Sequence, residues 1–172
     1  WLASEGCDVT LADLARLTDA FYIGGTKCGA LFGEALVLVN PALGDHFRTC
    51  MKQRGDVLAK GWLMGLQFYT LFQNGLYFDL ARKADRQAME IKAAFQKAGI
   101  PLWVDSPTNQ QFAVVSREQE AALAKDFIFE LSHAVDEGHN CIRFCTSWST
   151  RNEEVAALIA AIESLPGCEE AK

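Results

Sequence analysis

A glycine-rich segment near the start of the chain lies between two short apolar runs, and these features limit the folds open to the sequence. The runs cover residues 21–23 and 35–39, and Asn40 and Pro41 end the second one. The second run is continuously apolar, which is typical of a strand that is covered on both faces, as in the layers of an α/β protein. The sequence therefore predicts an α/β fold.

The glycine-rich segment carries a lysine, within the sequence GGTKCG at residues 24–29. Lysine is strongly hydrated, so its place in an apolar setting has two interpretations. Its stem can lie on apolar surface while the ammonium reaches water. Alternatively, Lys27 is a desolvated amine that forms a Schiff base with a carbonyl cofactor or substrate. The local sequence leaves both open.

The composition argues against several classes of protein. The chain has 172 residues, half of them hydrophobic, which suffices for one domain or two small ones. Its formal net charge of -6 argues against a surface for nucleic acid or an anionic membrane. No apolar run is long enough to span a bilayer, and the first residues do not resemble a signal peptide. We therefore expect a cytoplasmic protein with neither nucleic-acid nor membrane partners.

Six cysteines are scattered through the chain, at positions 7, 28, 50, 141, 145 and 168. No CxxC pair occurs, which argues against a disulfide scaffold or a zinc ribbon and fits a reducing cytoplasm. His133, His139, Cys141 and Cys145 do not have the spacing of a closed zinc site, so we predict no metal. The chain begins at Trp1, without a starting methionine, which suggests a piece of a longer protein.

Capping and periodicity predict three helices in the first half of the chain, over residues 10–20, 42–54 and 57–72. Thr10 and Asp13 form a capping box at the start of the first. The third is apolar on nearly every side, which is typical of a core helix or an oligomer interface. An amphipathic helix capped by Asp79 follows and connects to a second unit. Its predicted apolar stripe consists of Leu80, Ala84, Ala88, Ile91 and Phe95.

Apolar runs in the second half predict strands over residues 102–104, 111–115, 127–131 and 141–146. Ser116 with Gln119 predicts the capping box of a helix, and Thr150 with Glu153 predicts another that begins the last helix. The second unit is therefore a small α+β unit behind a connector helix. We predict two domains, residues 1–78 and 79–172.

Two further basic residues each have a structural and a functional interpretation. The period of a strand places Arg143 between Cys141 and Cys145 on one face. Arg143 either pairs with a nearby acid or holds a carboxylate with its planar, paired donors. Lys60, the one formal charge in the apolar helix, either reaches water from the helix start or contacts an anion. Spacing alone does not decide between these interpretations.

No serine-hydrolase elbow or nucleotide phosphate loop occurs in the chain. Instead, three segments in order resemble the threonine aldolase / β-eliminating lyase family of pyridoxal-phosphate enzymes. They read GGTKCGA at residues 24–30, GEALV at 33–37 and IRFCTSW at 142–148. Residues 52–68 and 107–110 also resemble the family, so the resemblance covers nearly the whole chain.

The resemblance implies the C-terminal portion of a fold-type-I, aspartate-aminotransferase-like enzyme, with the first predicted domain as the tail of its cofactor-binding domain. Lys27 would carry pyridoxal 5'-phosphate as the internal-aldimine lysine, with Thr26 also at the cofactor. Lys60 would reach the cofactor phosphate, and Arg143 would grip the α-carboxylate of a small amino-acid substrate. The family's enzymes are oligomers, so the resemblance also implies a homo-oligomer.

The family's Asp-Gly-Ala-Arg motif, whose aspartate pairs with the pyridine nitrogen, is absent from the 172 residues. If these residues are all that exists, we expect no useful catalysis. For a longer parent protein the resemblance implies threonine aldolase-like cleavage or β-elimination. The alternatives are another pyridoxal-phosphate reaction, such as a transaminase-like one, or an incomplete fragment that acts only as a folded module.

Overall fold

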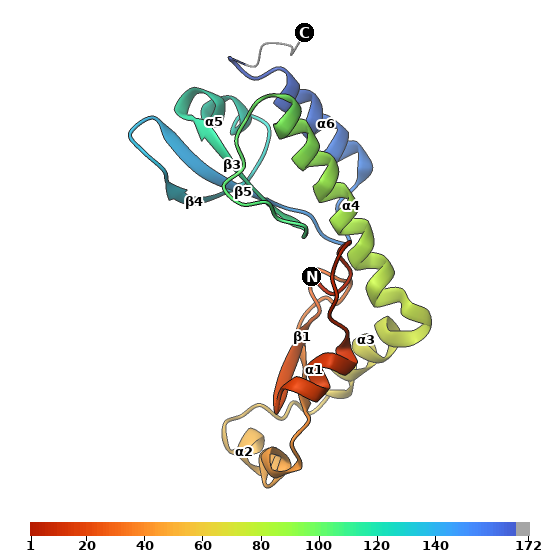
Figure 1. Ribbon diagram of the computed structural model, residues 1–172. Coiled ribbons are helices and arrows are strands. Elements are labelled where there is room, and N and C mark those ends of the chain that lie inside the picture. The colour runs from red at the N-terminus through yellow and green to blue at the C-terminus, as the bar shows by residue number, and fades with distance from the viewer. Residues whose placement is uncertain (168–172) are drawn as a thin grey trace. The chain divides into compact units, whose positions relative to one another are not determined.

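The computed structural model describes residues 1–167, and the chain divides into two compact units (Figure 1). The division falls within helix α4 (Leu76–Lys97). The first unit comprises residues 2 and 6–80, and the second comprises residues 1, 3–5 and the chain from Ala81 on. The functional assignment of the two predicted domains stays a prediction.

Helix α1 (Leu11–Leu17) begins at the capping box that the sequence predicts. The Thr10 hydroxyl accepts a hydrogen bond from the Asp13 backbone N–H at 3.2 Å, and the Asp13 carboxylate accepts one from the Thr10 N–H at 3.0 Å. The box is confirmed because it depends only on groups three residues apart, which satisfy each other in the first turn.

Strands β1 (Ala20–Gly24) and β2 (Glu34–Leu38) form a two-stranded antiparallel sheet where the two apolar runs predict strands. The prediction that β2 is covered on both faces is wrong for the described chain. Tyr22 and Leu36 lie opposite each other in the register and are 71% and 50% exposed. The residues that the structure describes therefore leave one face of this sheet open.

The predicted helix over 42–54 is interrupted. A 3₁₀ turn, η1 (Pro41–Gly44), precedes helix α2 (Phe47–Gln53), and His46 between them has a left-handed backbone with φ 55°. A left-handed residue cannot continue a right-handed helix, so the two pieces stay separate.

Helix α3 (Trp62–Phe72) is shorter than the predicted helix over 57–72, because a turn precedes it as far as its N-cap, Gly61. A 3₁₀ turn, η2 (Gln73–Gly75), follows α3, and Asn74 within it has φ 54°. Asparagine is among the few residues that adopt this backbone readily, which explains the sharp break before α4.

Helix α4 begins at Leu76, so the prediction that Asp79 caps it is wrong. Asp79 instead lies in the first turn, where a carboxylate interacts favourably with the helix dipole. The predicted apolar stripe is largely confirmed, and its buried members are Ala84, Ala88, Ile91 and Phe95.

The second unit contains an antiparallel sheet in the order β3-β5-β4 (Figure 1). Its strands are β3 (Gln110–Ser116), β4 (Glu130–Ala134) and β5 (His139–Cys145). β3 and β5 lie close to the predicted runs, but β4 begins later than residue 127. Phe127 and Phe129 pack against the core before the strand starts, which accounts for the apolar residues there.

The strand predicted over 102–104 is wrong. Only Leu102 forms a β-bridge, with Ala113. The chain turns directly afterwards, since the Ser106 N–H donates to the Val104 carbonyl at 3.0 Å.

Helix α5 (Arg117–Leu123) begins at the predicted capping box, in which the Ser116 hydroxyl accepts from the Gln119 N–H at 3.2 Å. The Gln119 side chain accepts from the Ser116 N–H at 3.0 Å in return. This prediction is confirmed.

Helix α6 (Asn152–Glu163) begins one residue later than a box of Thr150 and Glu153 requires, so that box is wrong. The Glu154 carboxylate instead accepts from the Arg151 N–H and Nε, both at 3.0 Å. The Thr150 hydroxyl accepts a backbone N–H in the preceding turn.

The core of the second unit lies between one face of the sheet and helices α4, α5 and α6. Fully burying a valine, leucine, isoleucine or phenylalanine side chain contributes about 1.5–3 kcal/mol. The core residues are Ile91, Ala94, Phe95, Ile100, Ala113, Val115, Leu123, Ile142, Phe144, Val155, Leu158, Ile162 and Leu165. Within the described part of the chain, no helix is long and apolar enough to cross a membrane.

Candidate functional site

Residues 25–33, here called the Lys27 loop, connect β1 to β2 and pack against α3. Gly25 is buried in this loop. A Cβ at Gly25 would lie 2.6 Å from the Cβ of Ala30 and 2.9 Å from Cζ of Phe68. Both distances are shorter than van der Waals contact, so only glycine fits here while α3 keeps its position.

Two further glycines let the Lys27 loop approach α3 closely. Gly29 has φ 110°, and a Cβ there would lie 2.9 Å from Cδ2 of Leu71. Gly33 has φ 85°, and a Cβ there would lie 2.8 Å from Cε of Met64. Both the backbone angle and the available space favour glycine. The glycine-rich sequence around Lys27 is therefore a packing requirement of this loop.

Hydrogen bonds connect the Lys27 loop to itself and to α3. The Gly25 carbonyl accepts from the Ala30 N–H at 3.0 Å. The Gln67 side chain of α3 accepts from the Leu31 N–H at 2.8 Å and donates to the Phe32 carbonyl at 3.3 Å. One α3 side chain thus satisfies two backbone groups of the loop, which fixes its path past the helix.

Tyr77, in the first turn of α4, holds the end of β1 where the Lys27 loop begins. Its hydroxyl donates to the Gly24 carbonyl at 2.8 Å, and its ring stacks on Phe72 with 5.0 Å between ring centroids. Burial, followed by the nearby Cys28 thiol, raises the pKa of Tyr77 well above its usual range. The hydroxyl therefore stays protonated and donates at physiological pH. Sequence reasoning missed this residue because its partner is distant in the chain.

Lys27 and Thr26 lie next to each other on the exposed part of the loop. Of the two interpretations that the sequence leaves open, this exposure agrees with an ammonium that reaches water. Neighbouring glycines have no side chains with which to cover the amine. In the described chain Lys27 reaches water, and its attachment to a cofactor stays a prediction.

Lys60 is exposed in the turn before α3, outside the helix in which the sequence places it. The same helix contacts the Lys27 loop through Met64, Gln67 and Phe68. The structure thus agrees with a lysine that reaches water at the start of the helix. A contact between Lys60 and an anion stays a prediction.

Arg143 of β5 belongs to the second unit, and 32% of its side chain is exposed. Its Nη1 donates to the side-chain oxygen of Gln110 at 2.9 Å, and its Nη2 pairs with the Glu130 carboxylate. Of its flanking residues, Cys141 is buried and Cys145 is exposed. The structure therefore shows the pairing with an acid. Glu130 could not be identified from sequence, because local patterns do not give the register between strands.

The residues considered for zinc have other contacts. The ring of His133 lies 4.6 Å from that of Trp103, and His139 Nδ1 lies 3.0 Å from a carboxylate oxygen of Asp136. Among residues 1–167, no group of three or more His, Cys, Asp or Glu side chains could hold a metal ion. The five cysteines that the structure describes form no disulfide with one another, and Cys168 lies outside the described residues.

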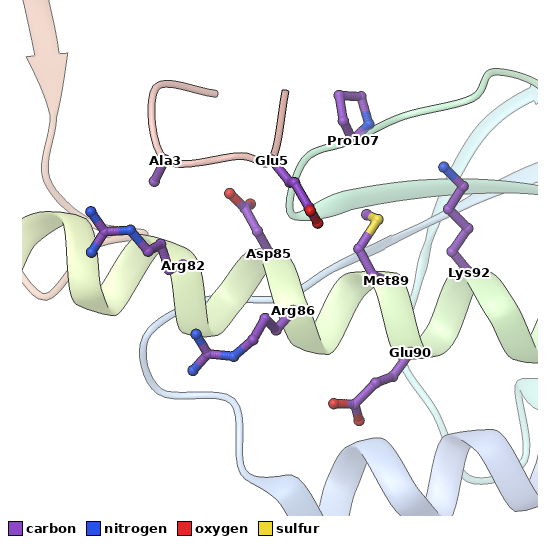
Figure 2. A pocket seen from close by; sticks show the side chains of 9 residues that line it. All are labelled: Ala3, Glu5, Arg82, Asp85, Arg86, Met89, Glu90, Lys92 and Pro107. Atoms are coloured by element: carbon purple, nitrogen blue, oxygen red, sulfur yellow. The ribbon is translucent and has the colours of Figure 1, made fainter. Parts of the chain in front are cut away.

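A pocket of about 820 Å³ lies along α4 in the second unit (Figure 2). It is lined by Ala3, Glu5, Arg82, Asp85, Arg86, Met89, Glu90, Lys92 and Pro107. Figure 2 shows Asp85 and Met89 on the side of the helix where Ala3 and Glu5 lie. Asp85 is only 9% exposed, and its Oδ2 has no hydrogen-bond partner among the described residues. Burial raises the pKa of this carboxyl. Sequence reasoning did not single it out, since charged residues are common on amphipathic helices.

Comparisons with known proteins agree on one group. No family model matches the chain. The chain is similar to a low specificity L-threonine aldolase of Pseudomonas aeruginosa, with 28% identity over 166 residues that cover 94% of this chain and 46% of the relative. A low specificity L-threonine aldolase of a second Pseudomonas strain is 27% identical over 149 residues, which cover 86% of this chain and 42% of the relative.

Among solved structures, the threonine aldolase of Leishmania major matches with a TM-score of 0.91 and 41% identity, over 94% of this chain and 47% of that one. The chain spans about half the length of the relatives it matches. These findings confirm the resemblance to threonine aldolases. They also confirm the fold class, an α/β chain with the fold of about half of a fold-type-I enzyme.

Proposed function

We propose that this chain is part of a pyridoxal-phosphate-dependent amino-acid lyase similar to threonine aldolase, in which Lys27 holds the cofactor. One observation carries the proposal. A lysine lies on a glycine-packed loop of a chain that matches a threonine aldolase structure over 94% of its length at 41% identity.

The residues of the Lys27 loop fit pyridoxal phosphate. Covalent attachment needs a primary amine that the aldehyde can reach, and Lys27 presents one on the exposed side of the loop. Thr26 places a hydroxyl next to it that can donate to a cofactor oxygen. When bound, pyridoxal phosphate supplies an electron sink for a bond broken at the α-carbon of the substrate.

The proposed roles of the other residues follow from their chemistry. Lys60 supplies an exposed ammonium, a compact charge suited to the cofactor phosphate. Arg143 supplies a planar guanidinium whose paired N–H donors suit the α-carboxylate of an amino acid. The Lys27 loop packs closely on α3, so the backbone that carries Lys27 is held in place. This positions the Lys27 amine for attachment to the cofactor.

The proposed reaction of the whole protein is cleavage between Cα and Cβ of a small β-hydroxy amino acid such as threonine. The named relatives, two of them low specificity L-threonine aldolases, support this substrate class. The chain spans 42% and 46% of these relatives, so we expect no turnover by the 172 residues alone. We also propose that the protein is cytoplasmic and that it is a homo-oligomer. Exposed apolar residues on α3 support the self-association.

Mixing the 172-residue chain with pyridoxal phosphate tests the attachment. We expect the absorption band of covalently bound cofactor and, after borohydride reduction, an added mass on the peptide that contains Lys27. Lys27→Ala should lose both signals. Lys52→Ala removes another exposed lysine of the first unit and should keep both. A chain without the band, or a Lys27→Ala variant that retains it, contradicts the proposal.

The reaction is tested on the whole protein with threonine as substrate. We expect glycine and acetaldehyde in equal amounts, measured by chromatography and by reduction of the aldehyde. A protein that binds the cofactor through Lys27 but forms neither product would indicate a different pyridoxal-phosphate reaction.

A further inference from the structure

The guanidinium of Arg143 already has an anionic neighbour from its own chain. Glu130 lies opposite Arg143 in the register of β4 and β5, and the two side chains form an ion pair. An arginine proposed to hold the carboxylate of a substrate therefore holds a carboxylate of the protein in the described structure.

Glu130 occupies a place from which it can leave Arg143. Its strand, β4, is at the edge of the sheet, and the pairing shifts register between Leu131 and His133, directly after Glu130. The Glu130 side chain is 64% exposed, against 32% for Arg143. Ion pairs with this much exposure contribute little to stability, so another carboxylate can replace Glu130 at small cost.

Gln110 holds Arg143 in a different way. It belongs to β3, on the other side of β5, and its neutral side-chain oxygen accepts from Nη1 at 2.9 Å. When Glu130 moves away, Gln110 still fixes one edge of the guanidinium. The edge at Nη2 then becomes available to a ligand carboxylate.

We propose that Glu130 is an internal competitor for the carboxylate site at Arg143 and thereby limits the affinity for amino acids. This inference rests on the proposed function, in which Arg143 binds the α-carboxylate. A ligand with a carboxylate displaces Glu130 and pairs with Arg143. A simple amine has no carboxylate with which to displace Glu130, so the competition acts on amino acids and not on amines.

Titration of the 172-residue chain with glycine measures the competition without cofactor or turnover. The NMR signals of the residue 143 backbone amide and of the Arg143 Nε–H report the binding. We expect Glu130→Gln to lower the Kd for glycine about two- to fivefold, the size expected for a partly exposed ion pair. Methylamine, which lacks the carboxylate, should move neither signal in either protein.

Glu137→Gln is the matched control. It removes the same charge from the turn between β4 and β5, where Glu137 is exposed. We expect it to bind glycine like the unsubstituted chain, and added salt to reduce the gain of Glu130→Gln.

The other outcomes contradict either the competition by Glu130 or the carboxylate site at Arg143. Equal or weaker glycine binding by Glu130→Gln overturns the competition, and weaker binding would mean that Glu130 positions the guanidinium. Arg143→Gln separates this failure from that of the proposed function. If it loses glycine binding while Glu130→Gln changes nothing, only the competition is wrong. If Arg143→Gln binds glycine undiminished, or if neither the unsubstituted chain nor Glu130→Gln shows saturable binding, the carboxylate site and the inference both fall.

Discussion

Asp85 couples the stability of the second unit to pH through a single buried side chain. Burial raises its pKa above the ordinary 3.8, although the Trp1 amino group and the Asn109 N–H act in the opposite direction. The folded state therefore holds the proton more tightly than the unfolded state. Stability is highest below the ordinary pKa, and it falls as the pH rises from there through the raised pKa of the folded state.

Replacing Asp85 with asparagine should remove this loss. Asparagine has the same shape, keeps an oxygen for the Asn109 N–H and carries no charge to desolvate. We expect Asp85→Asn to raise the free energy of unfolding at neutral pH by about 1 kcal/mol and to change it little at strongly acidic pH. Denaturant unfolding at both pH values measures the difference.

Glu90→Gln, at an exposed position of the same helix, is the control for charge alone. It should change the free energy of unfolding little at either pH. A loss of stability in Asp85→Asn at neutral pH would mean that the ionised carboxylate is stabilised in the folded state, contrary to the buried, unpaired Oδ2.

The Tyr77 hydroxyl should affect both the stability of the first unit and the attachment of the cofactor, because it holds the start of the Lys27 loop. Tyr77→Phe keeps the ring stacked on Phe72 but loses the hydrogen bond of 2.8 Å to the Gly24 carbonyl. We expect the free energy of unfolding to fall by about 1 kcal/mol and the attachment of pyridoxal phosphate to Lys27 to slow. Tyr69→Phe, at a 67% exposed position, should leave both unchanged. Equal behaviour of the two variants would show that the Tyr77 hydroxyl does not hold the loop.

At the scale of elements, the contact between the Lys27 loop and α3 should be sensitive to a single methyl group. Gly25→Ala places a Cβ 2.6 Å from the Ala30 Cβ, and the backbone of the loop must shift to relieve the overlap. We expect a loss of about 1–3 kcal/mol in the free energy of unfolding, and weaker attachment of the cofactor to Lys27. Thermal and denaturant unfolding measure the first effect.

Gly65→Ala is the control, since a Cβ at this exposed position of α3 meets nothing within 4 Å. Alanine is the better helix former, so stability should stay the same or rise by up to about 1 kcal/mol. A Gly25→Ala variant as stable as the unsubstituted chain would contradict the close packing of the loop.

The elements that could be predicted from sequence are those set by neighbouring residues. The boxes at Thr10 and Ser116 are correct because both partners lie within one helical turn. The predicted box at Thr150 is wrong. Two consecutive glutamates, Glu153 and Glu154, could each serve as the acidic partner in a capping box, and only the contact with Arg151 shows that Glu154 does. The strand predicted over 127–131 begins too early, because Phe127 and Phe129 pack against the core before β4 starts.

The candidate site could be predicted only in part, for the same physical reason. Lys27 could be singled out because its glycine-rich neighbours are local in sequence. Tyr77 and Glu130 could not, because each acts through a partner on another element, Gly24 and Arg143 respectively. The exposure of Lys27 also depends on what packs over the loop, which local sequence does not contain.

At the scale of the whole molecule, α3 combines a packed side with an exposed apolar side. Phe68 and Leu71 are buried. Trp62, Leu66 and Tyr69 of the same helix are 64%, 49% and 67% exposed. A helix that is apolar on nearly all sides is usually covered on all of them, so the exposed side is the part of the described chain where we expect another surface to bind.

We predict that this side of α3 takes part in self-association of the homo-oligomer. Leu66→Glu places a charge on it, and burying that charge would be costly, so sedimentation velocity should show a shift towards the monomer. Leu17→Glu changes another exposed leucine of the first unit, at 67% exposure in α1, and should leave the distribution as it is. A shift of the same size in both variants would indicate non-specific association of apolar surface. Unchanged association in Leu66→Glu would place the contact elsewhere on the chain.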